Sequence, residues 1–375
     1  MVSRFISSVR KLVEEKEKRG AVAWPPRVDY PVPCGAHRDK SGKWYPRDIG
    51  RSTMLSNGHV LFQWGDTFSH DHAGNFLGLT RNTCSSTTNP FDCTKSAYKS
   101  HQHNGMVKSL IPGWVVQQKL AWSFSGIIET SDPGSVLISG WTWYEDRQVV
   151  SGAAIPVYNY TGLAKIEYDT ASKRVTATRV IFGDSYRLFN TNEARYGSMS
   201  AVRSKGYIYL YGQVNDQNKS IHVARVKVDQ VTSRDCYEFW KGSGWVKWVD
   251  NLYRSVDIMR DIQHGAVFKS KMFGKHSKYK WVFIGCNGQG DNKVQMGRAI
   301  SPVGPWDIKT LNYDLYPLDS RQQPGGYAYC VYPHPWVRDT CLDGDLVISW
   351  SEGGMTGEVM MAQLRLAIVG GWRET

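Results

Sequence analysis

Acidic residues beside the beginnings of predicted strands are the side chains of this sequence best suited to acid–base chemistry. They are Asp48, Asp66, Glu129, Glu193, Asp261 and Glu352. Breaking or closing a C–O bond needs one carboxylic acid that protonates the departing oxygen and a second carboxylate that assists the attacking group. Asp66 ends an apolar run between Gly65 and Thr67, where an unused carboxylate would be costly. We therefore expect Asp66 to be the principal acid or base, with Glu129 or Glu193 as its partner.

Hydrogen-bond donors and aromatic side chains accompany these acids. Arg51 and His264 are the donors that we expect to act in catalysis, by polarising an oxygen of the substrate. Arg47 or Arg51 could instead pair with Asp66 and make it a structural residue. Further substrate contacts are predicted for Asp48, Trp64, Phe68, His72, His103, Trp141, Trp143, Tyr144, Tyr329, Trp350 and Glu352. Because most of these predicted contact residues are aromatic, they suit either a sugar ring or an apolar polycyclic substrate.

The histidines of the segments 70–72 and 101–103 raise the question of a metal ion. Their spacing is compatible with a cation site, but a polar loop over the rim of a pocket is the interpretation that we favour. The sequence contains no CxxC pair, no HExxH motif and no nucleotide-binding loop. We therefore expect neither a metal nor an organic cofactor.

Five copies of one pattern supply the strands that must position these residues. Each copy has small residues, a β-run ending in aromatic residues, a turn and a second β-run, with a period of roughly 65–75 residues. The copies begin at Arg51, Ser125, Ser198, His264 and Tyr329. A lone four-stranded sheet would expose both faces, whereas five sheets stacked around an axis cover one another. The pattern predicts an all-β, five-bladed β-propeller rather than two stacked β-sandwiches.

No linker divides residues 27–375, so we expect them to form a single propeller domain. Residues 1–26 would form a short amphipathic N-terminal helix and a lead-in, because apolar residues between Phe5 and Val13 fall near helical spacing. The ends of the innermost strands converge in a propeller. The architecture therefore predicts a pocket at the centre of one face.

Composition limits the class of protein and of partner. The 375 residues include 15 Trp, 20 Tyr and 36 Gly, which suits short strands joined by tight turns. The net charge of +12 is scattered rather than gathered in a basic arm, so we expect a small-molecule substrate and no nucleic acid. No apolar run approaches the roughly 20 residues of a membrane span, and no signal peptide is evident. A cytoplasmic location is predicted, although sequons at Asn159 and Asn218 leave a secretory route open.

The seven cysteines are odd in number and widely spaced, which argues against a disulfide framework. Two sequence-adjacent pairs, Cys84 with Cys93 and Cys330 with Cys341, could each close a short loop. Both pairings, and the oligomeric state, stay open at the level of sequence.

Short motifs give the sequence a resemblance to a known superfamily. Arg47-Asp48-Ile-Gly50 is followed by Trp64-Gly-Asp-Thr-Phe68, and later by Trp122-Ser-Phe-Ser-Gly126 and the segments 207–211 and 297–306. Together these resemble the fungal relatives of a five-bladed propeller superfamily that contains glycoside hydrolases. The resemblance covers the chain from about Arg27 onward and implies a propeller with a two-carboxylate site.

A second resemblance concerns the opening of the chain, which has an amphipathic segment followed by Trp24-Pro-Pro26 and His37-Arg38-Asp39. It is similar to fungal propeller proteins of natural-product pathways, namely those of trichothecene clusters and the hetero-Diels–Alderases of tropolonic sesquiterpenes. This resemblance implies a cofactor-independent cyclase that acts on a hydroxylated sesquiterpenoid or terpenoid adduct. The alternatives are a glycoside hydrolase that uses paired carboxylates and a non-catalytic carbohydrate-binding propeller.

Overall fold

The computed structural model describes most of the chain between residues 20 and 369. The described ranges are 20–37, 45–88, 97–113, 119–153, 155–214, 216–247, 255–288, 290–315, 328–337, 344–352 and 358–369. The amphipathic helix predicted at the N-terminus lies outside the described residues.

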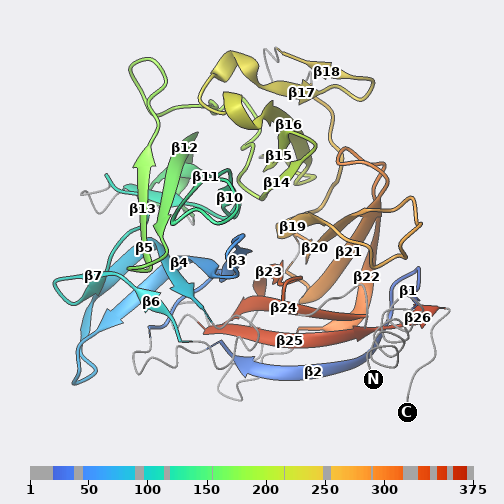
Figure 1. The fold of residues 1–375 in the computed structure, drawn as a ribbon, viewed down its shortest axis with the longest axis horizontal. Coiled ribbons are helices and arrows are strands. Elements are labelled where there is room, and N and C mark those ends of the chain that lie inside the picture. Colours follow the sequence, from blue (N-terminus) through green and yellow to red (C-terminus); the bar gives the residue numbers. More distant parts are fainter. Residues whose placement is uncertain are drawn as a thin grey trace, which may run out of the picture.

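Five antiparallel sheets surround one axis like the blades of a propeller (Figure 1). Blade 1 contains β3 (Arg51–Met54), β4 (Val60–His70), β5 (Phe76–Thr87) and β6 (Lys99–Ser100). Blade 2 contains β10 (Ile128–Glu129), β11 (Leu137–Gln148), β12 (Val157–Asp169) and β13 (Arg174–Arg179), with β9 (Lys119–Trp122) paired to β11. Blade 3 contains β14 (Ser200–Ser204), β15 (Tyr207–Gln213), β16 (Ile221–Lys227), β17 (Glu238–Trp240) and β18 (Trp245–Val246).

The last two blades complete the ring. Blade 4 contains β19 (His264–Lys269), β20 (Trp281–Cys286), β21 (Lys293–Ala299) and β22 (Asp307–Asp314). Blade 5 contains β23 (Tyr329–Pro333), β24 (Asp345–Glu352), β25 (Glu358–Leu366) and β2 (Val28–Ala36). Two short ladders lie outside the blades: β1 (Ala21–Val22) with β26 (Ile368–Val369), and β7 (Gln102–His103) with β8 (Met106–Val107).

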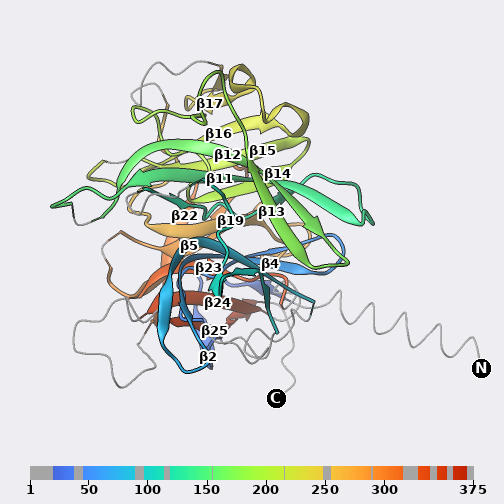
Figure 2. The same cartoon turned by 90° about the vertical axis from the view of Figure 1, so that its left-hand side faces the viewer.

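The N-terminal strand closes the propeller. Strand β2 pairs antiparallel with β25, so the last blade takes strands from both ends of the chain. Seen from the side in Figure 2, the twisted sheets follow one another from β2 and β25 to β16 and β17. Each innermost strand (β3, β10, β14, β19 or β23) lies in one of the five predicted repeat starts. The predicted five-bladed, all-β fold is confirmed.

The hydrophobic core is divided among the five seams between neighbouring blades. Each seam cluster takes buried residues from both of its blades: Leu61 and Ile166 for blades 1 and 2, Trp143 and Leu210 for 2 and 3, Tyr211 and Phe283 for 3 and 4, Ile284 and Trp350 for 4 and 5, and Phe62 and Val359 for 5 and 1. Burial of apolar surface between blades therefore stabilises the ring as a whole.

Four aromatic residues predicted to contact substrate belong instead to these seams. Trp64, Trp143, Tyr144 and Trp350 are each at most 2% exposed. On the second strand of a blade, alternate side chains point toward the neighbouring blade. Large apolar rings at these positions therefore fill the seam and do not reach the central face.

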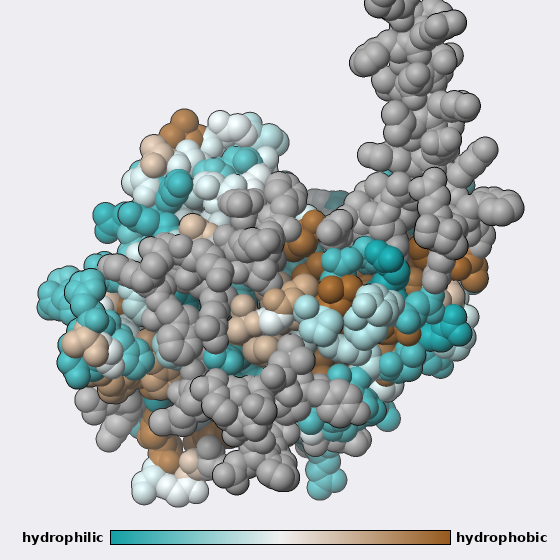
Figure 3. All heavy atoms as spheres, turned by 90° about the horizontal axis from the view of Figure 1, so that it is seen from below, coloured by the Kyte–Doolittle hydropathy of each residue, from teal (hydrophilic) through white to brown (hydrophobic). Residues whose placement is uncertain are grey.

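On the side of the molecule that Figure 3 shows, hydrophilic and hydrophobic residues alternate over the coloured surface. Among the described residues, exposed apolar side chains include Tyr30 and Val32 of β2. In the described part of the chain, no helix is long and apolar enough to cross a membrane.

Candidate active site

Asp48 and Asp66 lie together where the chain enters blade 1. Asp48 stands three residues before β3, and Asp66 lies in β4 beyond the paired residues Arg51 and Gln63. The backbone N–H of Asp66 donates a 2.7 Å hydrogen bond to Oδ1 of Asp48, and the hydroxyl of Tyr329 donates a 3.0 Å bond to Oδ2. Both oxygens of the Asp48 carboxylate are therefore held, with the second acid beside it.

Gly65 permits this close approach of the two acids. A Cβ atom at position 65 would lie 2.3 Å from Oδ1 of Asp48 and 2.7 Å from Cγ1 of Ile49. Real side chains do not tolerate such contacts, so only glycine lets the β4 backbone approach the carboxylate. In the Gly-Asp dipeptide of β4, Gly65 thus leaves room for the carboxylate of Asp48, and Asp66 supplies both the second acid and the N–H that bonds to Asp48.

Unusual backbone conformations flank the hydrogen bond between Asp48 and Tyr329. Ile49, next to Asp48, has a φ of 75°, and Cys330, next to Tyr329, has a φ of 56°. A left-handed conformation is costly for a β-branched residue. The N–H of Ile49 is held by a 2.8 Å hydrogen bond to Oγ of Ser351. Strain of this kind is concentrated at functional sites, where the surrounding fold maintains it.

The environment raises the pKa of both acids. Burial, followed by the charge of the neighbouring Asp66, raises the pKa of Asp48 to about 7. Burial also raises the pKa of Asp66, while Arg81 acts in the opposite direction, with its Nε 3.9 Å from Oδ1 of Asp66. Asp48 is therefore partly protonated near neutral pH, whereas the charge of Arg81 opposes the rise in the pKa of Asp66.

Aromatic residues from other blades form the floor around these acids. Phe124 and Tyr332 are buried in one cluster with Ile49, and the half-buried Trp122 and Tyr329 pack against it. The rings of Trp122 and Phe124 are stacked with centroids 5.7 Å apart. The acids thus adjoin an apolar, aromatic surface at the axis, the kind of lining that binds the face of a sugar or another ring.

Arg51 fills the axis beneath the floor. Its guanidinium donates to the carbonyl oxygens of Gly265 (3.2 Å) and Ser125 (3.3 Å) and to Oγ of Ser200 (3.4 Å). It also lies 5.1 Å from the centre of the Tyr332 ring. Burial lowers the pKa of Arg51 to about 10, so it is cationic at neutral pH. The residue predicted as a catalytic donor therefore ties blade 1 to the other four blades.

A second polar cluster lies on blade 2 and on the segment that leads into blade 3. Oε2 of Glu145 forms an ion pair with Nη2 of Arg147 at 2.5 Å and lies 3.8 Å from Nη1 of Arg195. Burial would raise the pKa of Glu145, but the two arginines outweigh it and hold the pKa below its ordinary value. The guanidinium of Arg147 stacks 4.1 Å above Trp122. This cluster therefore supports the aromatic floor with an ionised carboxylate that has no proton to give.

His264 lies between this cluster and the floor. Its ring is 6.0 Å from that of Phe124, and its buried Nδ1 has no hydrogen-bond partner among the described residues. Burial lowers the pKa of His264 to about 4, so the ring is neutral at pH 7. A neutral imidazole can donate or accept one hydrogen bond at each nitrogen, depending on its tautomer.

A sequence-family model described as "Domain of unknown function (DUF4185)" matches residues 46–353. The chain belongs to this family. The match includes Asp48, Asp66 and all five innermost strands of the propeller. No curated protein matches the chain in sequence.

Solved structures resemble this DUF4185 protein in fold. A presumed hydrolase from Bacteroides ovatus is 17% identical, with 85% of each chain covered and a TM-score of 0.60. A family 117 glycoside hydrolase from Zobellia galactanivorans is 10% identical, with 88% of this chain and 89% of that chain covered and a TM-score of 0.48. The catalytic domain of a family 62 α-L-arabinofuranosidase from Coprinopsis cinerea is 9% identical, with 94% and 99% covered and a TM-score of 0.46.

Glu129 does not join Asp66 in the DUF4185 protein. Its carboxylate accepts hydrogen bonds from the N–H (2.8 Å) and hydroxyl (2.5 Å) of Ser56, in the turn between β3 and β4. Asp66 lies further along β4 (Val60–His70), about 20 Å from the beginning of that strand at 3.3 Å per residue. The expected partnership of these two acids is therefore corrected: Asp48 is the neighbour of Asp66.

The other predicted acids have structural partners. Glu193 forms a 2.5 Å ion pair with Arg234 and accepts a hydrogen bond from the N–H of Asn190. Glu352 is 1% exposed and accepts a hydrogen bond from the indole of Trp350 in the seam between blades 4 and 5. Asp261 accepts a 3.2 Å hydrogen bond from the N–H of Gly288. Each is thus engaged in holding its own blade or loop.

The remaining predicted contacts are dispersed. Phe68 packs toward Phe76 in the β4–β5 hairpin, and His72 is exposed in the turn of that hairpin. His103 lines a pocket on the outer side of blades 1 and 2, and Trp141 packs against the seam between blades 2 and 3. Of the predicted site residues, the structure brings Asp48, Asp66 and Tyr329 into direct contact and places His264 at the same floor.

Sequence reasoning missed Glu145 and Arg147, because a Glu-x-Arg pair in a strand has no signal that separates it from a solvated ion pair.

Within the described ranges, no group of three or more His, Cys, Asp or Glu side chains could hold a metal ion. Cys84 and Cys330 are free thiols, whereas Cys93 and Cys341 lie outside the described residues.

Proposed function

We propose that this DUF4185 protein hydrolyses glycosidic bonds, with Asp48 as the general acid and Asp66 as the base. One observation carries the proposal: at the edge of an aromatic floor, the carboxylate of Asp48 accepts a hydrogen bond from the backbone N–H of Asp66, and the pKa values of both acids are raised. Glycoside hydrolysis requires two carboxyl groups in different protonation states on either side of the scissile bond.

The roles follow from the environments of the two acids. Asp48, with the pKa of about 7, retains the proton that passes to the leaving oxygen as the glycosidic C–O bond breaks. Asp66, which is 35% exposed and lies near Arg81, accepts a proton from the water that attacks the anomeric carbon. Return of that proton from Asp66 to Asp48 restores the starting state. Tyr329 orients Asp48, and Trp122 with Phe124 offers the surface on which the sugar ring stacks.

The similarity in fold to a presumed hydrolase supports hydrolysis rather than the sesquiterpenoid cyclisation that we expected from the sequence. The two reactions share acid–base steps, and they differ in whether water or a substrate oxygen attacks. A partly exposed base such as Asp66 has access to water, which favours the hydrolytic role. A non-catalytic carbohydrate-binding propeller would use the same floor without needing the raised pKa of Asp48.

The test is a panel of 4-nitrophenyl glycosides and oligosaccharides, assayed for 4-nitrophenol release and for new reducing ends. We expect at least one substrate to be hydrolysed, with kcat on oligosaccharides, whose leaving oxygen must be protonated, reduced at least about 100-fold in Asp48→Asn and in Asp66→Asn. Asp184→Asn removes an exposed carboxylate elsewhere and should leave the rate unchanged. Circular dichroism and thermal melting establish that each variant is folded.

Three outcomes would contradict the proposal. Full activity of Asp48→Asn on oligosaccharides would remove Asp48 from the acid role. Sugar binding without turnover, retained in both variants, would make the protein a lectin-like binder. Thermal stabilisation and product formation with hydroxylated sesquiterpenes alone would return the site to ring closure, because only a ligand that binds the native state raises the melting temperature.

A further inference from the structure

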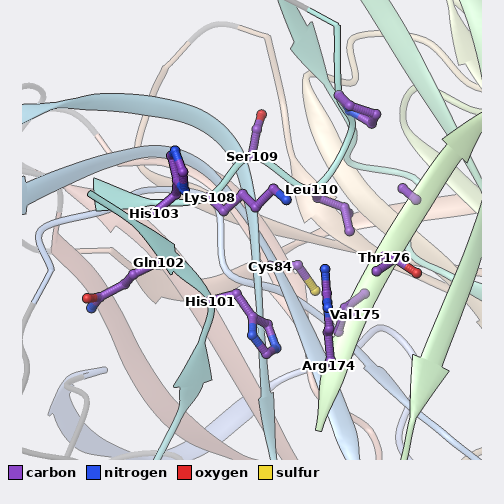
Figure 4. A pocket seen from close by; sticks show the side chains of 12 residues that line it. Cys84, His101, Gln102, His103, Lys108, Ser109, Leu110, Arg174, Val175 and Thr176 are labelled. Atoms are coloured by element: carbon purple, nitrogen blue, oxygen red, sulfur yellow. The ribbon is translucent and has the colours of Figure 1, made fainter. Parts of the chain in front are cut away.

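A second pocket lies away from the axis, where the outer strands of blades 1 and 2 meet. It has a volume of about 400 Å³, within the range of small-molecule sites. Cys84 of β5, the segment 101–112 and the beginning of β13 form its walls. Figure 4 shows Lys108, His101 and Arg174 gathered around one hollow with the thiol of Cys84. Its lining includes neither Asp48 nor Asp66 nor the aromatic residues of the axial floor.

Hydrogen bonds between the blades fix the shape of this pocket. The backbone carbonyl of Lys173, in the turn before β13, accepts a 3.2 Å bond from Oγ of Ser86 and pairs at 3.2 Å with Nε2 of His101. The hydroxyl of Ser109 donates at 3.2 Å to the carbonyl of Arg81. The wall from blade 2 is thus anchored to blade 1, so the hollow is preformed.

The lining combines an apolar floor with a basic rim. Leu110 and Cys84 are buried, and burial raises the pKa of the Cys84 thiol to about 12, so the thiol is neutral. Every other ionisable side chain of the lining is a base: His101, His103, Lys108 and Arg174. Within the described part of the chain, Lys108 and Arg174 form no ion pair, and neither a glutamate nor an aspartate lines the pocket.

We propose that this flank pocket binds a small organic anion, with its apolar part against Leu110 and Val175 and its phosphate or sulfate group at Lys108 and Arg174. Cations from two different blades converge on one preformed hollow without a counter-ion, so an oxyanion would complete charge-assisted hydrogen bonds there. The apolar floor can bury the organic part of an ester, which favours an ester over a free inorganic ion. This binding is independent of the hydrolytic role proposed for the axial site.

Isothermal titration calorimetry of the full chain tests the proposal, with phenyl phosphate and phenyl sulfate as probes and phenol and inorganic phosphate as references. We expect both esters to bind more tightly than either reference, and the stronger of the two distinguishes a phosphate from a sulfate site. The double variant Lys108→Gln/Arg174→Gln should weaken ester binding at least about tenfold. The matched control Lys227→Gln/Arg187→Gln removes the same charge from exposed positions elsewhere and should keep the affinity.

Failure of both esters to bind would overturn the proposal. So would phenol binding as tightly as phenyl phosphate, since the basic rim would then contribute nothing. Equal loss in the two double variants would mean that the net positive charge of the protein, rather than the pocket, attracts the anion. Thermal melting of both double variants confirms that any loss of affinity occurs in folded protein.

Discussion

The hydroxyl of Tyr329 donates a 3.0 Å hydrogen bond to Oδ2 of Asp48, which joins the innermost strand of the last blade to the segment that enters the first. The two residues are 281 positions apart in the sequence. Each is followed by a residue with positive φ, Ile49 or Cys330. The acid at the centre of the candidate active site is therefore positioned by closure of the ring and by backbone conformations that the closed ring maintains.

Gly65→Ala should destabilise the protein and displace Asp48. The new methyl group would lie 2.3 Å from the carboxylate, and relief of such overpacking costs about 1–3 kcal/mol. Urea denaturation gives the change in the free energy of unfolding. Gly244→Ala is the matched control, because no atom lies within 4 Å of its added Cβ. Equal losses of stability in the two variants would show that the β4 backbone at Gly65 does not closely approach the carboxylate of Asp48.

Asp48→Asn should make the stability less dependent on pH. The pKa of Asp48 is about 7 in the folded state and 3.8 as an ordinary aspartate, so the native state holds a proton that the unfolded state loses between these values. The free energy of unfolding therefore falls as the pH rises from about 4 to 7, by at most about 4 kcal/mol from this group.

Urea denaturation of the wild type and of Asp48→Asn between pH 4 and pH 8 measures this effect. The variant should lose less stability over the window and should be the more stable of the two at pH 8. Asp66 contributes in the same direction and remains in both proteins, so the difference between the two curves measures Asp48 together with its coupling to Asp66. Parallel curves would mean that the pKa of Asp48 is not raised.

Arg51→Met should destabilise the whole propeller. The substitution leaves the carbonyls of Gly265 and Ser125 without their guanidinium donor in a buried setting, at a cost of about 2–4 kcal/mol. Chemical denaturation measures the loss. Arg187→Met removes an exposed arginine for comparison. A loss no greater than that of Arg187→Met would show that Arg51 does not hold the blades together.

Glu129→Gln should leave the reaction at the axial site unchanged, because Glu129 contacts Ser56 at the opposite end of β4. Its expected cost is weaker bonding to Ser56 and Ser131, about 1 kcal/mol of stability. The initial rate with any substrate found in the glycoside panel checks this, with Asp66→Asn assayed in parallel. A loss of activity in Glu129→Gln comparable to that of Asp66→Asn would show that both ends of blade 1 take part in the reaction.

The sequence alone determined the fold class and the five innermost strands, and it singled out Asp66 as a candidate site residue. Strand and turn preferences are local, and five repeated copies of one pattern point to one architecture. A carboxylate after an apolar run is equally visible without coordinates. Only the tertiary structure decided that Asp48, rather than Glu129, accompanies Asp66, and that Trp64 and Trp350 fill seams. These relationships depend on which strand ends meet around the axis and on which blade each side chain faces. Residues far apart in the chain settle both when β2 pairs with β25 and the ring closes.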